Sequence, residues 1–170
     1  RGIRTSYNQY GQPTSQTDRF GNVTRTGYDQ SGLPTTLIDA NNRITRLKFD
    51  ARGNPTEVRD DRGNLLVTNT FNQYGEVLTS TKVNGTTTYF DYDLNGNQVA
   101  SWHFGGTGPD QVQILNTAQF DRLNRLVGSI QAVLPAGQFI TSNLTTAIIP
   151  VQYIISQTDT AFNAAGQVTS

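Results

Sequence analysis

The chain has 170 residues, of which 15% are charged, and its 13 basic and 13 acidic residues balance to a net charge of zero. This low charge, together with 8 Phe and 7 Tyr residues, excludes a solvated, highly charged disordered chain. The lack of a basic run argues against nucleic acid as a partner. The chain has no cysteine for disulfides or thiolate metal sites, and no apolar run long enough for a membrane span, so we expect no membrane insertion.

A short motif recurs along the chain: an aromatic residue, then Asp or Asn, two variable residues and Gly. Complete copies begin at positions 7, 28, 49, 71 and 92, which are 21 or 22 residues apart. A copy with Asn in place of Gly begins at position 120, and a complete copy begins at position 162. We interpret the chain as about eight units of about 21 residues. The signature residues of the repeat are Tyr7, Gly11, Tyr28, Asp29, Gly32, Phe49, Asp50, Gly53, Phe71, Gly75, Tyr92, Asp93, Gly96, Phe120, Asp121, Phe162 and Gly166.

A second turn signature lies between the first copies of the motif. It begins with Asp18, Asp39 and Asp60, each 11 residues after the aromatic residue of its own repeat. Asp or Asn is favoured at the first position of a type I turn and Gly at the fourth, so both signatures predict tight turns. We expect Gly32 and Gly53 to have positive φ angles, where a side chain would clash.

The segments between turns have the pattern of β-strands. The turns leave about six residues each, which is a usual strand length. Thr24, Thr26 and Tyr28 alternate with other residues, and so do equivalent residues in later repeats, which places β-branched and aromatic side chains on one face. We expect the successive rings to form a ladder on the buried face of the sheet. The fold class is therefore predicted as all-β, a repetitive antiparallel meander that is curled or layered and has essentially no helix.

The regular pattern extends over residues 1–104 and becomes irregular over residues 105–170, which we still interpret as one continuous repeat domain. A Gly-rich loop insertion is predicted at 105–110. The segment 132–156 contains the densest apolar runs, interrupted by Pro150. We expect longer hairpins here that pack on a neighbouring layer; the alternative is that these strands continue the ladder.

Tyr28-Asp29…Gly32 and Phe49-Asp50…Gly53 resemble the YD repeats of bacterial RHS proteins, of the BC component of insecticidal toxin complexes and of teneurins. The segment 120–126 resembles a variant of the same repeat. The resemblance implies a long β-strip that winds into a shell, which in RHS and toxin-complex proteins encloses a toxic domain. The chain departs from the family in having few repeats and no toxin domain. It also lacks the Asp-Pro segment of the self-cleaving site, so no residue inherits that role.

Candidate catalytic and metal-binding residues are few. His103 stands beside Trp102 without the other residues that a general base or a metal site needs, so we expect it to be structural. Calcium needs six or more oxygen ligands, and we expect the candidate aspartates to initiate turns instead. These aspartates are Asp18, Asp39, Asp60 and Asp61. The prediction is a protein that is not an enzyme, with no catalytic residue, cofactor or metal site.

Two functions remain open after these exclusions. The first is a structural building block, part of a β-shell or of an end-to-end fibre, which associates through its strand edges with itself or with further repeats of a longer chain. This includes a fragment of a toxin-encapsulating RHS shell. The second is an adhesin-like module that binds carbohydrate or a cell-surface partner. The sequence begins without Met, so we expect a piece of a longer or processed protein, extracellular or on the surface of a bacterial cell.

Overall fold

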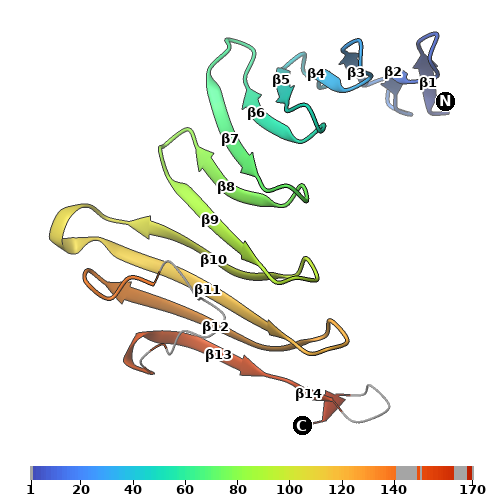
Figure 1. Cartoon of the computed structure of the whole chain (residues 1–170). Helices are drawn as coiled ribbons and strands as arrows, with labels where there is room; N and C mark the ends of the chain where they lie inside the picture. Colours follow the sequence, from blue (N-terminus) through green and yellow to red (C-terminus); the bar gives the residue numbers. More distant parts are fainter. Residues whose placement is uncertain (1, 141–148, 150, 163–167, 170) are drawn as a thin grey trace. The chain divides into compact units, whose positions relative to one another are not determined.

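The computed structural model describes the chain in four stretches, which are residues 2–140, 149, 151–162 and 168–169 (Figure 1). The chain divides into two compact units. The N-terminal unit comprises Arg1–Phe71 and Thr81–Asn84, and the C-terminal unit comprises Asn72–Ser80 and Gly85–Ser170.

Short antiparallel strands build the N-terminal unit, and each pairs with the next along the chain. The pairing shifts by one residue at the signature aromatic, as at Ser6/Tyr7 and Gly27/Tyr28, which marks a β-bulge beside the turn. The strands are β1 (Arg4–Tyr7), β2 (Pro13–Thr17), β3 (Val23–Tyr28), β4 (Pro34–Ile38), β5 (Ile44–Phe49), β6 (Pro55–Arg59) and β7 (Leu65–Phe71).

The C-terminal unit continues the same antiparallel pattern with longer strands. The strand β8 (Val77–Lys82) has residues in both units. The strands that follow are β9 (Thr87–Tyr92), β10 (Gln98–Gly105), β11 (Val112–Phe120), β12 (Leu126–Pro135) and β13 (Ile154–Asp159), with β14 (Ala161–Phe162) and β15 (Val168–Thr169) in a separate small sheet. Strand order follows chain order from β1 to β13, and the described helical turns are the short 3-10 segments η1 (Gly108–Asp110) and η2 (Val151–Tyr153). The predicted all-β antiparallel meander is confirmed.

The insertion predicted at 105–110 forms the connection between β10 and β11, and it also lengthens the hairpin around it. These two strands have 8 and 9 residues, against 4 to 7 in the N-terminal unit. In the segment 132–156, the described parts of β12 and β13 pair with each other as further rungs of the ladder. For the strands, therefore, continuation of the ladder is the correct reading. Phe139, Ile140 and Ile149 of the connection pack against the sheet, and residues 147 and 148 of the apolar run lie outside the described residues.

The fully buried side chains lie on one face of the C-terminal unit. Residues that face one another across successive strands form a row on this face, made of Tyr89, Trp102, Leu115, Ala132 and Ile154. Leu115 and Ala132 are fully buried, and the Tyr89 and Trp102 rings stack with centroids 5.3 Å apart. None of these residues belongs to the repeat signature. The signature rings are less buried than this row, since six of them are half-buried and Tyr7 is exposed. On β3 and β5 they still lie on the less exposed face of the strand, so the expected buried ladder is only partly covered.

Described residues of the connection between β12 and β13 contact this buried face. Phe139 packs against Phe104, with ring centroids 5.0 Å apart, and Ile149 is buried in the same cluster. The side chain of Gln113, which is fully buried, donates from Nε2 to the carbonyl oxygen of Ile140 and accepts from the Ile140 N–H at 2.8 Å. This amide thus pairs with the backbone of Ile140 as a neighbouring strand would, and it fixes the connection on the sheet.

Candidate functional site: the repeated turns

The signature residues form a turn with a fixed set of hydrogen bonds, which the turn at Asp29 illustrates. The Asp29 N–H donates to the Leu33 carbonyl oxygen at 3.0 Å, and the Gly32 N–H donates to the Asp29 carbonyl oxygen at 3.1 Å. Asp29 Oδ1 accepts from the N–H groups of Ser31 and Leu33, both at 2.9 Å. The same four bonds occur in the turns that begin at Asn8, Asp18, Asp39, Asp50, Asp60, Asn72, Asp93 and Asp121.

The fourth residue of each turn has the left-handed conformation. Gly32 and Gly53 have φ angles of 85° and 86°, which confirms the expectation from the sequence. Asn42 and Asn124 occupy the same position with φ angles of 62° and 58°. Asn tolerates this region better than other residues with a side chain, which explains why it replaces Gly in these two turns.

The first and fifth side chains of many turns bind each other, and this clamp was not predicted from the sequence. Asp18 Oδ2 accepts from Asn22 Nδ2 at 2.7 Å, and Asn8 Nδ2 donates to Gln12 Oε1 at 2.8 Å. Where the first residue is Asp, the fifth supplies a donor, and where it is Asn, the fifth supplies an acceptor. The visible signal was this pairing of residue types four positions apart, which recurs at Asp50/Asn54, Asp60/Asn64, Asn72/Glu76, Asp93/Asn97 and Asp121/Arg125.

The fifth residue also reaches the next turn on the same edge of the sheet. Gln12 Nε2 donates to the Gly32 carbonyl oxygen at 2.9 Å. Asn97 Nδ2 donates to the side chain of the next turn in the C-terminal unit, at Asn124 Oδ1 and 3.1 Å. Hydrogen bonds from the fifth residue therefore tie two of the described turns to their successors, one through a backbone oxygen and one through a side chain.

The signature aromatic residues alternate with prolines along the strands of the N-terminal unit. Tyr7 faces Pro13, and Tyr28 faces Pro34 on the neighbouring strand. The Tyr28 hydroxyl donates to the Pro13 carbonyl oxygen at 2.9 Å, which joins the second repeat to the first. The predicted ladder of rings is thus a row in which each ring is separated from the next by a proline-bearing strand.

The remaining predicted residues lie as follows. The Phe162 ring of β14 lies under the Arg125 guanidinium, with the Arg125 Cζ atom 4.1 Å from the ring centroid. Gly166 lies outside the described residues. His103 is half-buried on β10, where it faces Ile114 of β11. Within the described parts of the chain, no group of His, Cys, Asp and Glu side chains is arranged to hold a metal ion.

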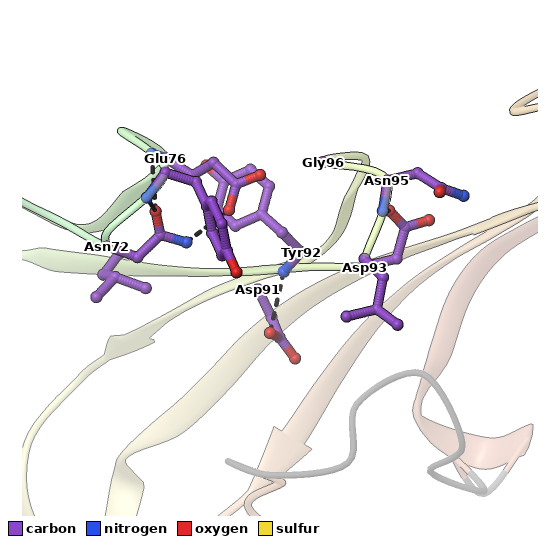
Figure 2. Close-up of a pocket in the computed structure, with 10 residues that line it drawn as sticks. Asn72, Glu76, Asp91, Tyr92, Asp93, Asn95 and Gly96 are labelled. Carbon is purple, nitrogen blue, oxygen red and sulfur yellow. Dashed lines mark hydrogen bonds between the residues drawn. The ribbon is translucent and has the colours of Figure 1, made fainter.

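A hollow of 390 Å³ lies between two successive turns of the C-terminal unit (Figure 2). The turn at Asn72 contributes Tyr74 and Glu76, and the next turn and the strand before it contribute Asp91, Tyr92 and Asp93. Burial and the nearby Glu76 carboxylate raise the pKa of the Tyr92 hydroxyl. The hollow thus combines ring faces with carboxylates and amides, which are groups that bind sugar hydroxyls.

An equivalent hollow lies in the N-terminal unit. Its volume is 280 Å³, and its lining includes Tyr10, Gln12 and the turn residues Asp29 and Gly32. Tyr10 and Tyr74 are the third residues of their turns, and each is 78% exposed. The hollow is therefore a product of the repeat itself, formed where a tyrosine at a turn tip lies beside the following turn.

The model of the RHS repeat family matches residues 7–44 and 28–65. Residues 7–65 thus match the RHS repeat, as the resemblance in the sequence implied. The turns described above continue the same geometry beyond residue 65, as far as Asp121 and Arg125.

Solved structures show the same fold over 98% of this chain. The crystal structures of TcdB2-TccC3 and TcdB2-TccC3-Cdc42 match with a TM-score of 0.71, at 14% and 15% identity. The Photorhabdus luminescens Tc holotoxin pore matches with a TM-score of 0.52, at 14% identity. The chain spans 9% of the first two matched chains and 12% of the third. A search of curated proteins found no match.

The RHS turns lower the pKa of several of their aspartates. For Asp18, Asp50, Asp60 and Asp93 the largest cause is the hydrogen bond from the Asn side chain at the fifth position. Backbone N–H groups add to the effect, because a hydrogen bond donated to a carboxylate favours its charged form. These carboxylates are therefore acceptors that hold the turns together.

The lowered pKa values predict acid-sensitive stability. A carboxyl with a folded-state pKa below its ordinary value of 3.8 stabilises the fold above that pH, and this contribution is lost as the pH falls through the lower folded-state pKa. We expect the urea midpoint to fall progressively from about pH 5 towards about pH 1. Asp60→Asn keeps the Oδ1 acceptor, as in the natural turn at Asn8, but has no carboxyl group that protonates. The variant should be less stable than the parent at neutral pH, and this difference in the free energy of unfolding should shrink as the pH falls. Parallel pH curves for the parent and this variant would contradict the assignment.

The left-handed turn position predicts a strong penalty for a β-branched residue. Gly53→Val places such a side chain at a φ of 86°, and we expect a loss of about 1–2 kcal/mol in the free energy of unfolding, measured in urea. Thr56→Val on β6 is the matched control, since Thr and Val have similar shapes and strand φ angles suit both; its effect should be about 0.5–1 kcal/mol. Equal losses at the two positions would show that turn strain does not limit substitution at Gly53.

Proposed function

We propose that this chain is a non-catalytic wall segment of a larger β-shell in a secreted or cell-surface protein, joined to further RHS repeats through its strand edges. The observation that carries the proposal is the identical turn geometry of successive repeats, with a hydrogen bond from one turn to the next in the case of Gln12 and Gly32. Because this geometry is the same from repeat to repeat, a further repeat can be added in the same way. The likeness to chains of TcdB2-TccC3, of which this chain spans 9%, supports a place within a longer array.

The ends of the sheet support the same proposal. In the described strand order, β1 and β13 are the outermost strands of the main sheet. An outermost strand presents backbone N–H and C=O groups that another strand can pair with.

The described part of the chain contains no helix of the length and apolar character that a membrane crossing requires.

A structural role without catalysis is supported by the turn carboxylates. Five turn aspartates, Asp18, Asp50, Asp60, Asp93 and Asp121, have a lowered pKa, and so does Glu57, whose pKa is lowered by Arg59 and Lys48. Each of these groups accepts hydrogen bonds that maintain a turn or a cross-strand pair. The function we propose for them is to hold the repeat in register.

Sedimentation velocity at increasing concentration tests the proposal. We expect the chain to self-associate, and hydrogen exchange of the β1 and β13 amides to slow as it does so. Ile155→Glu places a charge on the edge strand β13, where the side chain is 63% exposed, and it should weaken association. Val151→Glu, at an 84% exposed position in η2, is the control and should have no effect. A monomer at every concentration, with slow exchange on both edge strands, would overturn the proposal.

A second candidate function is carbohydrate binding at the hollow of Figure 2. The observation that favours it is the combination of Tyr74, Tyr92 and Asp91 around one depression. A titration with a panel of oligosaccharides, followed by NMR, should shift the resonances of these residues. Tyr74→Ala should remove the shifts, and Phe20→Ala, at an exposed turn tip on the other edge, should leave them. Absence of shifts in the unmodified chain would exclude this function for the sugars in the panel.

A further inference from the structure

The zero net charge of the chain conceals an unequal distribution between its two units. The N-terminal unit contains eleven Lys and Arg against seven Asp and Glu, which gives an excess of four positive charges. The C-terminal unit contains two Arg against six Asp and Glu, which gives an excess of four negative charges. The net charges of the two units therefore have opposite signs and equal magnitude.

Five basic strand residues of the N-terminal unit lie on one face of its sheet, together with Glu57. Alternation along the strands, with the pairing of Arg25 to Ile38 and of Arg46 to Arg59, places the charged strand residues on the same face. The opposite face carries uncharged residues such as Thr26, Leu37 and Val58. We call the first surface the basic face; its charged residues are Arg4, Arg25, Arg46, Lys48, Glu57 and Arg59.

Only part of the basic face is neutralised from within. Glu57 bridges Lys48 at 3.2 Å and Arg59 at 2.7 Å, and Arg46 donates to the backbone oxygens of Asp60 and Asp61. Arg4 and Arg25 are exposed and occupy the same position in successive repeats, two strands or about 9.6 Å apart. Two exposed cations at equivalent positions on one sheet face suit an anionic partner surface.

The C-terminal unit offers such a surface. Glu76, Asp91 and Asp93 line one hollow, and no basic residue is among the residues that line it. Of the two arginines in this unit, Arg125 forms an ion pair with Asp121 at 2.7 Å. The acidic surplus of the unit therefore lacks a matching positive charge within the unit.

We propose that the basic face of one copy of this chain binds the acidic C-terminal unit of a second copy. The two surfaces differ, so the contact is heterologous, and each bound pair still has one basic face and one acidic unit available. Association then proceeds head to tail. This interface does not use the strand edges, so it goes beyond the proposed function. An experiment can therefore disprove this interface and leave the edge-pairing proposal intact.

Salt dependence is the first test. The screening length falls from about 30 Å at 0.01 M salt to about 8 Å at 0.15 M, and complementary charged surfaces lose attraction accordingly. We expect self-association of the unmodified chain, measured by sedimentation velocity, to weaken about tenfold between these two conditions. Association that is independent of salt but sensitive to Ile155→Glu would overturn this inference and support the edge-pairing proposal.

Charge exchange is the second test. Arg4→Glu with Arg25→Glu cancels the positive surplus of the N-terminal unit, and Asp91→Lys with Asp110→Lys cancels the negative surplus of the C-terminal unit. Both double variants are made in the Ile155→Glu background, which weakens edge pairing, and each alone should then stay monomeric at low salt. A mixture of the two should form a one-to-one complex that grows no further, because it contains one intact basic face and one intact acidic unit.

The control for charge exchange is Arg4→Lys with Arg25→Lys, which keeps the charge and should associate as the unmodified chain does. Circular dichroism verifies the fold of each variant, and if one fails to fold, the salt series on the unmodified chain still decides. Unchanged association of both double variants, or a mixture that assembles no more than either variant alone, would overturn the proposal.

Discussion

Leu115→Ala is expected to lower the free energy of unfolding by about 2–5 kcal/mol, as large-to-small changes in a closed core do. Leu115 is fully buried and lies between Trp102 and Ala132 in the row of facing residues. The β12–β13 connection covers this row, so the site cannot collapse easily around a smaller side chain. Trp102 is the only tryptophan in the chain, and its fluorescence in a urea titration reports unfolding of this core.

The control for this prediction is Leu126→Ala on β12, where the leucine is 46% exposed. Removing a half-exposed side chain costs less transfer free energy and leaves no closed cavity, so we expect a loss of about 1 kcal/mol. If both substitutions had the same effect, the cluster around Leu115 would not be a close-packed core.

The turns and strands were predictable because their determinants are local. Asp29 and Gly32 fix a turn through bonds within five residues, and the alternation of Thr24, Thr26 and Tyr28 fixes the faces of the strand that precedes it. Neither needs any distant residue. The repeat register therefore follows from sequence spacing, and the structure has the same register.

The location of the core was not predictable from the repeat. The signature rings lie beside the turns; Tyr28 and Phe49 each face a proline there and stay half-buried. The core forms instead where the insertion lengthens β10 and β11 and where a connection folds back over them. Which residues a distant segment covers is decided by tertiary packing, and strand alternation alone does not reveal it.

The role of Gln113 was missed for a related reason. Glutamine is usually exposed, and nothing in its neighbours distinguishes it from the many other Gln residues of the chain. Its partner, Ile140, is 27 residues away and contributes only its backbone. The turn clamp between Asn8 and Gln12 was also not predicted, although its residue pairing is visible in the sequence. The preferences of a type I turn concern the first and fourth positions, and the clamp joins the first and the fifth.

Gln113→Leu is expected to loosen the β12–β13 connection. The substitution keeps much of the side-chain volume but removes the amide that pairs with the Ile140 N–H and carbonyl oxygen. A buried backbone group without a partner costs about 1–3 kcal/mol, so we expect a loss of stability of that order. We also expect the Ile140 amide to exchange its hydrogen faster, by the factor of about ten that corresponds to each 1.4 kcal/mol.

Gln131→Leu provides the matched control, because Gln131 is exposed on β12 and its side chain bonds to the Asn116 side chain at 3.0 Å. An exposed substitution of this kind should change stability by less than about 0.5 kcal/mol and should leave exchange at Ile140 unchanged. If Gln113→Leu instead left the Ile140 amide protected, the connection would be held by the apolar contacts of Phe139 and Ile149. In that case the paired amide would add no stability of its own, and the apolar contacts alone would close this face.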